Sequence, residues 1–120
     1  MIRGRYHGEV HGIAQVDNAN KQANVFDAPG EGKTIYITHA VVSVVEAADG
    51  GGTVSLIDNA SGDVIFTADA DSPGVYALTW GDYGYPLSEN SALVLQVSGA
   101  TTDATAHCSV VGYVKRKTLA

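Results

Sequence analysis

Short runs rich in Val, Ile, Thr and Tyr recur along this chain, and each is ended by Gly, Asp, Asn or Pro. No window keeps apolar residues at the i, i+3, i+4 and i+7 spacing of an amphipathic helix. Such runs, at spacings of about 8–12 residues, are typical of a β-sandwich or barrel. We therefore predict an all-β fold, an antiparallel β-sandwich of about eight strands with jelly-roll-like connections. The predicted strands are 6–16, 24–27, 34–46, 53–58, 63–67, 75–80, 92–98 and 104–115.

Length and composition favour one domain with its own core. The chain has 120 residues, of which 45% are hydrophobic, so we take residues 1–120 as a single β-sandwich domain. The single cysteine excludes an intramolecular disulfide. No apolar stretch is long enough to span a membrane, and the first residues lack the apolar centre of a signal peptide. We expect synthesis in a reducing cytoplasm and no membrane partner.

Charge is distributed unevenly along the sequence. The net charge is -6, and residues 34–114 contain no Lys or Arg. If the chain ends lie together, they form a basic pole on an acidic body, which could orient docking onto a larger surface. We predict that 1–16 and 115–120 are docking ends, with ordinary solvated ends as the alternative, and the acidity argues against nucleic acid. The predicted contact residues are Arg3, Arg5, Lys115, Arg116 and Lys117.

The run 34–46 is apolar on both sides when read as a strand. A strand with one solvated face alternates apolar and polar residues, so both faces of this strand should be covered. Either a loop or a second subunit could cover the outer face. The predicted subunit-contact residues are Ile35, Tyr36, Ile37, Val42 and Val44.

Candidate chemical sites are weak. His7, Glu9 and His11 share one side of a strand, and with His39 or His107 they could hold a divalent metal. Solvated polar residues on an edge strand are the simpler interpretation. Cys108 follows His107 directly, so the two side chains should point to opposite faces, which is a poor geometry for a catalytic pair. We predict no enzymatic activity, no catalytic residue and no cofactor, and a small metalloenzyme is the alternative.

An aromatic-rich loop precedes Pro86. It contains Trp80, Tyr83 and Tyr85 among glycines. These rings either fold inward and cap one end of the sandwich or form a recognition loop for a sugar or a protein.

Turn-and-strand segments within residues 34–115 resemble a known class of proteins. The segments are 38–44, 52–59 and 62–65, and then 86–95 and 110–114. They resemble small β-sandwich proteins of tailed-bacteriophage virions, which include capsid decoration (cement) proteins and fibre or knob proteins. This resemblance implies a non-enzymatic structural role, commonly as a homotrimer seated on the capsid.

We therefore expect a bacteriophage virion structural protein, a capsid decoration protein that binds and stabilises the assembled head. The expected partners are the major capsid protein and other copies of this chain in a homotrimer. The expected location is the outer capsid surface, after synthesis in the host cytoplasm. The alternative is a carbohydrate- or receptor-binding module of a phage tail or fibre that works through Trp80, Tyr83 and Tyr85.

Overall fold

The computed structural model describes residues 8–17, 20–46, 52–70, 72–98 and 104–117. These residues contain β-strands and no helix, so the predicted all-β class is confirmed. No helix that is long and apolar enough to cross a membrane occurs in these ranges. The strands are β1 Gly8–Val16, β2 Gln22–Phe26, β3 Lys33–Glu46, β4 Thr53–Asp58, β5 Val64–Asp69, β6 Gly74–Thr79, β7 Tyr85–Pro86, β8 Leu93–Ser98 and β9 Thr105–Arg116.

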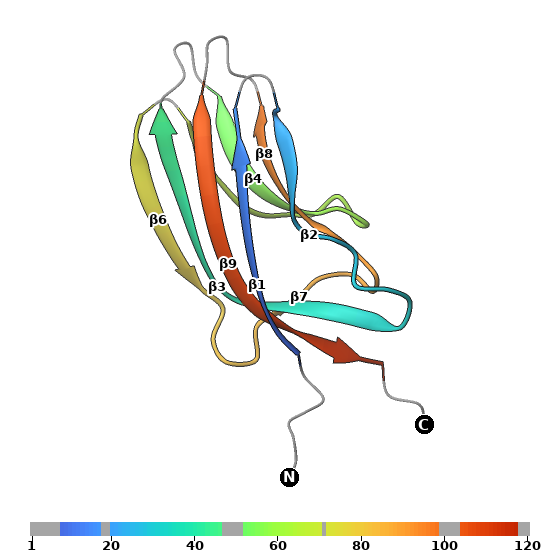
Figure 1. Ribbon diagram of the computed structural model, residues 1–120. Helices are drawn as coiled ribbons and strands as arrows, with labels where there is room; N and C mark the ends of the chain where they lie inside the picture. Colours follow the sequence, from blue (N-terminus) through green and yellow to red (C-terminus); the bar gives the residue numbers. More distant parts are fainter. Residues whose placement is uncertain (1–7, 18–19, 47–51, 71, 99–103, 118–120) are drawn as a thin grey trace.

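The strands form two sheets that pack face to face (Figure 1). Sheet I has the order β1-β9-β3-β6, with the short β7 beside β3, and sheet II has the order β2-β8-β4-β5. Every pairing is antiparallel. Apart from β7, the strand order is that of a jelly roll, in which two Greek keys form a double sheet. The predicted antiparallel sandwich with jelly-roll-like connections is therefore correct.

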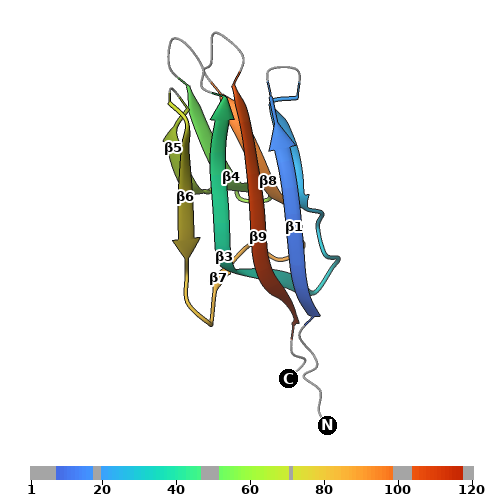
Figure 2. The same cartoon turned by 60° about the vertical axis from the view of Figure 1, so that its left-hand side comes forward.

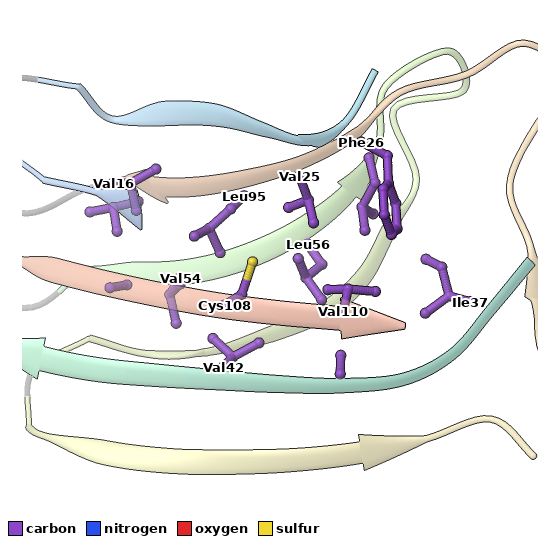
Figure 3. Close-up of a cluster of buried hydrophobic side chains, with 14 of the residues drawn as sticks. Val16, Val25, Phe26, Ile37, Val42, Val54, Leu56, Leu95, Cys108 and Val110 are labelled. Carbon is purple, nitrogen blue, oxygen red and sulfur yellow. The ribbon is translucent and has the colours of Figure 1, made fainter. Parts of the chain in front are cut away.

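One hydrophobic core fills the space between the sheets (Figure 3). Val42 and Val110 reach into it from sheet I, and Val54, Leu56 and Leu95 reach into it from sheet II. All five side chains are fully buried. Because successive side chains on a strand point to opposite faces, the residues between them form the two outer faces of the sandwich.

A β-bulge in β3 changes which of its residues face the core. Ile37 pairs with Gly112, but the next residue of β9, Val111, pairs with His39, so Thr38 is the extra residue. The hydroxyl of Thr38 donates a hydrogen bond to the carbonyl oxygen of Val111 over 3.1 Å. Such a bulge bends the strand and reverses its inward–outward alternation, and β3 bends strongly in Figure 1.

Because of this bulge, most of the predicted subunit-contact residues of β3 face the core. Inward-facing residues on either side of it belong to the core, namely Ile35 and Ile37 before it and Val42 and Val44 after it. The prediction that these four side chains contact another subunit is therefore wrong. Tyr36 lies outside this set, half-buried on the outer face. After the bulge, the exposed residues of β3 include Val41 and Val45.

Candidate assembly surface

The central part of the outer face of sheet I consists of cross-strand rows that contain no Asp, Glu, Lys or Arg. Its four long strands lie side by side in Figure 2, with sheet II behind them. The pairing registers align the outward-facing residues of these strands into three rows. In the order β1, β9, β3 and β6, the rows are His11–Val111–His39–Thr79, Ile13–Ser109–Val41–Ala77 and Gln15–His107–Ser43–Val75. None of these residues is Asp, Glu, Lys or Arg, and we call these rows the uncharged face.

Large apolar side chains of the uncharged face stand in solvent. Ile13 is 79% exposed and Val75 is 70% exposed. A shallow groove of about 480 Å³ runs over β9 between β1 and β3. Its walls include Ile13 and Val41, and its floor includes His107 and Ser109. Exposed apolar side chains grouped on one face in this way mark an interaction site more often than apolar side chains scattered singly over a surface.

The outer face of sheet II is mixed. Part of it consists of hydroxyl side chains that bond to one another. The hydroxyl oxygens of Thr53 and Ser98 are 3.0 Å apart, and Ser55 donates to Thr67 over 3.2 Å. The registers also align an apolar row on this face, Val94–Ile57–Val64, in which Val64 is 55% exposed.

Basic residues gather at one end of the sandwich. Lys33, at the start of β3, pairs in register with Arg116, and Lys115 and Lys117 flank Arg116. Gly8 pairs with Val114 at the same end. The two predicted docking ends therefore leave the sandwich side by side, although Arg3 and Arg5 lie outside the described residues. Lys33 was not among the predicted contact residues. It directly precedes the longest predicted strand, and this position could have shown that it lies at one end of the sandwich.

Acidic residues share this end, so the described residues do not form a purely basic pole. Glu89 accepts a hydrogen bond from the Gly32 backbone N–H over 3.0 Å. Its carboxylate also lies 4.0 Å from the Lys117 ammonium nitrogen. Such an exposed ion pair contributes little to stability. The hydrogen bond joins the loop that precedes β8 to the turn that precedes β3. Other carboxylates at this end are Glu9, Asp27, Glu31 and Asp82.

A second groove, of about 450 Å³, lies at the same end. Its apolar lining includes Val10, Phe26 and Val114. Lys33 and Arg116 also line it. An apolar groove beside cations suits an apolar segment that also carries a carboxylate.

The aromatic loop is divided between packing and exposure. Trp80 and Tyr85 are partly buried and pack against the core, as the capping interpretation requires. Tyr83 is 89% exposed. The hydroxyl of Tyr113 donates a hydrogen bond to the backbone carbonyl of Tyr83 over 2.7 Å, which ties the loop to sheet I. Of the three predicted recognition residues, Tyr83 is the one whose ring is available to a ligand.

The candidate metal ligands do not converge among the described residues. Glu9 and His11 share the outer face of β1, with 3.6 Å between Oε1 and Nε2, and both are well exposed. His7 lies outside the described residues. No group of three His, Cys, Asp or Glu side chains that could hold a metal ion occurs in the described part of the chain.

The His107–Cys108 pair has the predicted geometry. His107 is exposed on the outer face, whereas Cys108 is buried in the core. Burial raises the pKa of the Cys108 thiol to about 11, although a backbone hydrogen bond with Ala14 opposes the shift. Cys108 is therefore a protonated core residue and not a nucleophile.

One buried carboxylate has a structural role. Asp58, at the end of β4, is only 3% exposed. It accepts hydrogen bonds from the Ser91 hydroxyl and from both the backbone N–H and the hydroxyl of Ser88. Burial alone would raise the pKa of this carboxyl, but the hydrogen bonds from Ser91 and Ser88, with a smaller contribution from Ser61, hold the pKa below its ordinary value. This network joins the β4–β5 hairpin to the loop before β8.

Comparisons with known proteins find the same fold at low sequence identity. No family model and no curated protein matches this chain. A chain of the cyanophage Pam1 capsid asymmetric unit is similar, with a TM-score of 0.55 and 16% identity over 94% of this chain and 89% of that chain. A Bacillus endospore appendage, from a family of disulfide-linked pili, is similar with a TM-score of 0.51 and 12% identity over 98% of this chain and 96% of that chain. At these identities the likeness concerns the fold.

The resemblance to β-sandwich virion proteins therefore holds at the level of the fold. Of these two structures, one belongs to a capsid asymmetric unit and the other to pili.

Proposed function

We propose that this chain is a structural protein of a bacteriophage virion, a capsid decoration or cement protein that binds the assembled head. The observation that carries the proposal is the uncharged face, which exposes Ile13, Val41 and Val75 on a chain of net charge -6. A protein that works alone in water gains nothing from such a face, whereas a subunit of an assembly buries it. The fold shared with a chain of the Pam1 capsid supports the same role.

Docking on the major capsid protein uses the end of the sandwich from which both chain ends leave. Lys33 and Arg116 beside the apolar groove, with Arg3 and Arg5 in the preceding segment, supply cations for an acidic surface of the shell. A protein that binds only the assembled shell stabilises it by mass action and needs no catalysis or cofactor. This role places the protein on the outer capsid surface after its synthesis in the host cytoplasm.

The protein also assembles with copies of itself. The resemblance to decoration proteins implies a homotrimer. The geometry of the uncharged face favours pairs of copies instead, and a mass measurement on the free protein distinguishes the two.

A capsid-binding assay tests the docking proposal. Purified protein is added to particles that lack it, and the bound protein is counted after sedimentation. Charge reversal at Arg3, Arg5, Lys115 and Arg116 should lower the occupancy at least tenfold. Arg116→Glu alone is compared with Lys21→Glu, the matched single reversal, because Lys21 is an exposed lysine that precedes β2 at the opposite end of the sandwich. Unchanged occupancy after the four reversals contradicts the proposed docking.

A second candidate function is recognition of a glycan or receptor by a tail or fibre module. The exposure of Tyr83 favours it, because a free aromatic ring can stack on a sugar. Binding on a glycan array that is lost in Tyr83→Ala, with no loss of stability, would support this alternative.

A further inference from the structure

We propose that the uncharged face of sheet I is covered by the same face of a second copy of this chain. The inference rests on the proposed assembly role, because it names the partner of one surface. It concerns the free protein, however, so it can fail while capsid docking stands, and the reverse is also true.

Charge selects this face for self-association. The chain carries 13 acidic and 7 basic residues, so two copies repel each other when their acidic loops approach. Across the three rows from His11 to Val75 there is no acidic or basic side chain apart from the imidazoles. Two copies can therefore meet through these rows without bringing like carboxylates together.

The rows are complementary to themselves. A two-fold axis that runs along the strands between β9 and β3 places β1 of one copy over β6 of the other and β9 over β3. In the middle row this sets Ile13 against Ala77, a large side chain against a small one. The same axis sets Val41 of one copy against Ser109 in the groove of the other. In the middle row, large side chains thus meet small ones, as in a packed sandwich core.

The area fits a weak pair that forms and dissociates with concentration. With strands about 4.8 Å apart and residues about 3.3 Å apart, three rows on four strands cover roughly 380 Å² in each copy. Two such faces bury roughly 760 Å² together, which is below the threshold of about 1,000 Å² for a stable interface and within the range of transient ones.

Solution mass is the first test. Sedimentation velocity of the full chain at increasing concentration should show a dimer, at twice the mass of the 12.4 kDa chain. Ile13→Asp and Val41→Asp should weaken the association at least tenfold, because each copy then buries an unpaired charge. Thr67→Asp, on the outer face of sheet II, is the matched control and should remain dimeric. A monomer at every concentration, a trimer, or a dimer unaffected by Ile13→Asp overturns the proposal.

A cross-linking test fixes the alignment and does not depend on destabilising variants. In one copy, residues 13 and 77 lie on the two outermost long strands of sheet I, about 14 Å apart. In the proposed pair they oppose each other across two sheets about 10 Å apart, which is too far for a direct disulfide, so the two thiols are joined by a short bifunctional thiol reagent. The reagent should therefore convert the double variant Ile13→Cys with Ala77→Cys into a covalent dimer, whereas Ile13→Cys with Thr67→Cys should give no covalent dimer. No covalent dimer from the first variant, or equal amounts from both, contradicts the face-to-face alignment.

Discussion

Tyr36 on β3 and Tyr113 on β9 stack on the outer face of sheet I, with ring centroids 5.0 Å apart and planes inclined by 2°. The Lys115 ammonium nitrogen lies 6.0 Å from the centroid of the Tyr36 ring, within the range of a cation–π contact. Because the Tyr113 hydroxyl also holds the carbonyl of Tyr83, the stack links the aromatic loop to the end that carries the basic residues. A substitution at Tyr113 should therefore affect both the aromatic loop and the Tyr36 ring at the basic end.

Two substitutions at Tyr113 separate its hydrogen bond from its stacking. Tyr113→Phe keeps the stack and loses the bond to Tyr83, so we expect a loss of about 0.5–1 kcal/mol in the free energy of unfolding. Tyr113→Ala also loses the stack, which adds about 0.5–1.5 kcal/mol. Urea denaturation measures both losses. Equal losses in the two variants would show that the stack contributes nothing.

The Asp58 network should make stability depend on pH. The pKa of Asp58 is lower in the folded protein than in the unfolded chain. Its contribution to stability is therefore complete above the unfolded value of about 3.9 and is lost as the pH falls through the folded value. We expect Asp58→Asn to lower the free energy of unfolding by about 1.5–3 kcal/mol at pH 7, because a buried charged acceptor is removed.

Urea midpoints between pH 7 and pH 2.5 measure this dependence. Asp58→Asn should show a weaker decline than the wild type toward acid. Asp63→Asn is the control, because Asp63 is exposed in the same hairpin, and it should keep the wild-type decline. A wild-type slope in Asp58→Asn would contradict the assigned role.

Glycine is required where β9 crosses the bent part of β3. A Cβ atom at Gly112 would lie 2.2 Å from the carbonyl oxygen of Tyr36. At Gly74, on β6, it would meet only the ring of Tyr76 at 3.7 Å or more. We expect Gly112→Ala to lower the free energy of unfolding by about 1–3 kcal/mol, because the backbone of β3 or β9 must move to make room for the methyl group. Gly74→Ala should change the free energy of unfolding by less than about 0.5 kcal/mol. Thermal melting of the two variants compares the costs, and similar melting temperatures would contradict the close approach.

The sequence predicted the strands well because turn residues and β-branched runs are local signals. The eight long strands agree with the predicted ranges within a few residues. β7 was missed because Tyr85–Pro86 is too short to show a pattern.

The faces of β3 could not be predicted in the same way. The bulge at Thr38 arises from pairing with a distant strand, and no residue type near it signals an extra residue. Alternation without the bulge puts Val42 and Val44 on the same face as Tyr36, whereas the bulge leaves Tyr36 on the outer face, turns Val42 and Val44 into the core and exposes Val41. The expectation of an apolar outer face was sound, but its residues come from four strands that are distant in sequence. Only the registers bring Ile13, Val41 and Val75 onto one surface.

Trp80 and Tyr83 should respond oppositely in tests of stability and of recognition. Trp80 packs against the core but is only partly buried, so Trp80→Ala should cost about 2–3 kcal/mol, below the range for a fully buried Trp. Tyr83 stands in solvent, so Tyr83→Ala should change the free energy of unfolding by less than about 0.5 kcal/mol. Chemical denaturation followed by far-UV circular dichroism measures both values. If Tyr83→Ala destabilises the fold as much as Trp80→Ala, the loop is a cap throughout, and the recognition alternative loses the one ring that favours it.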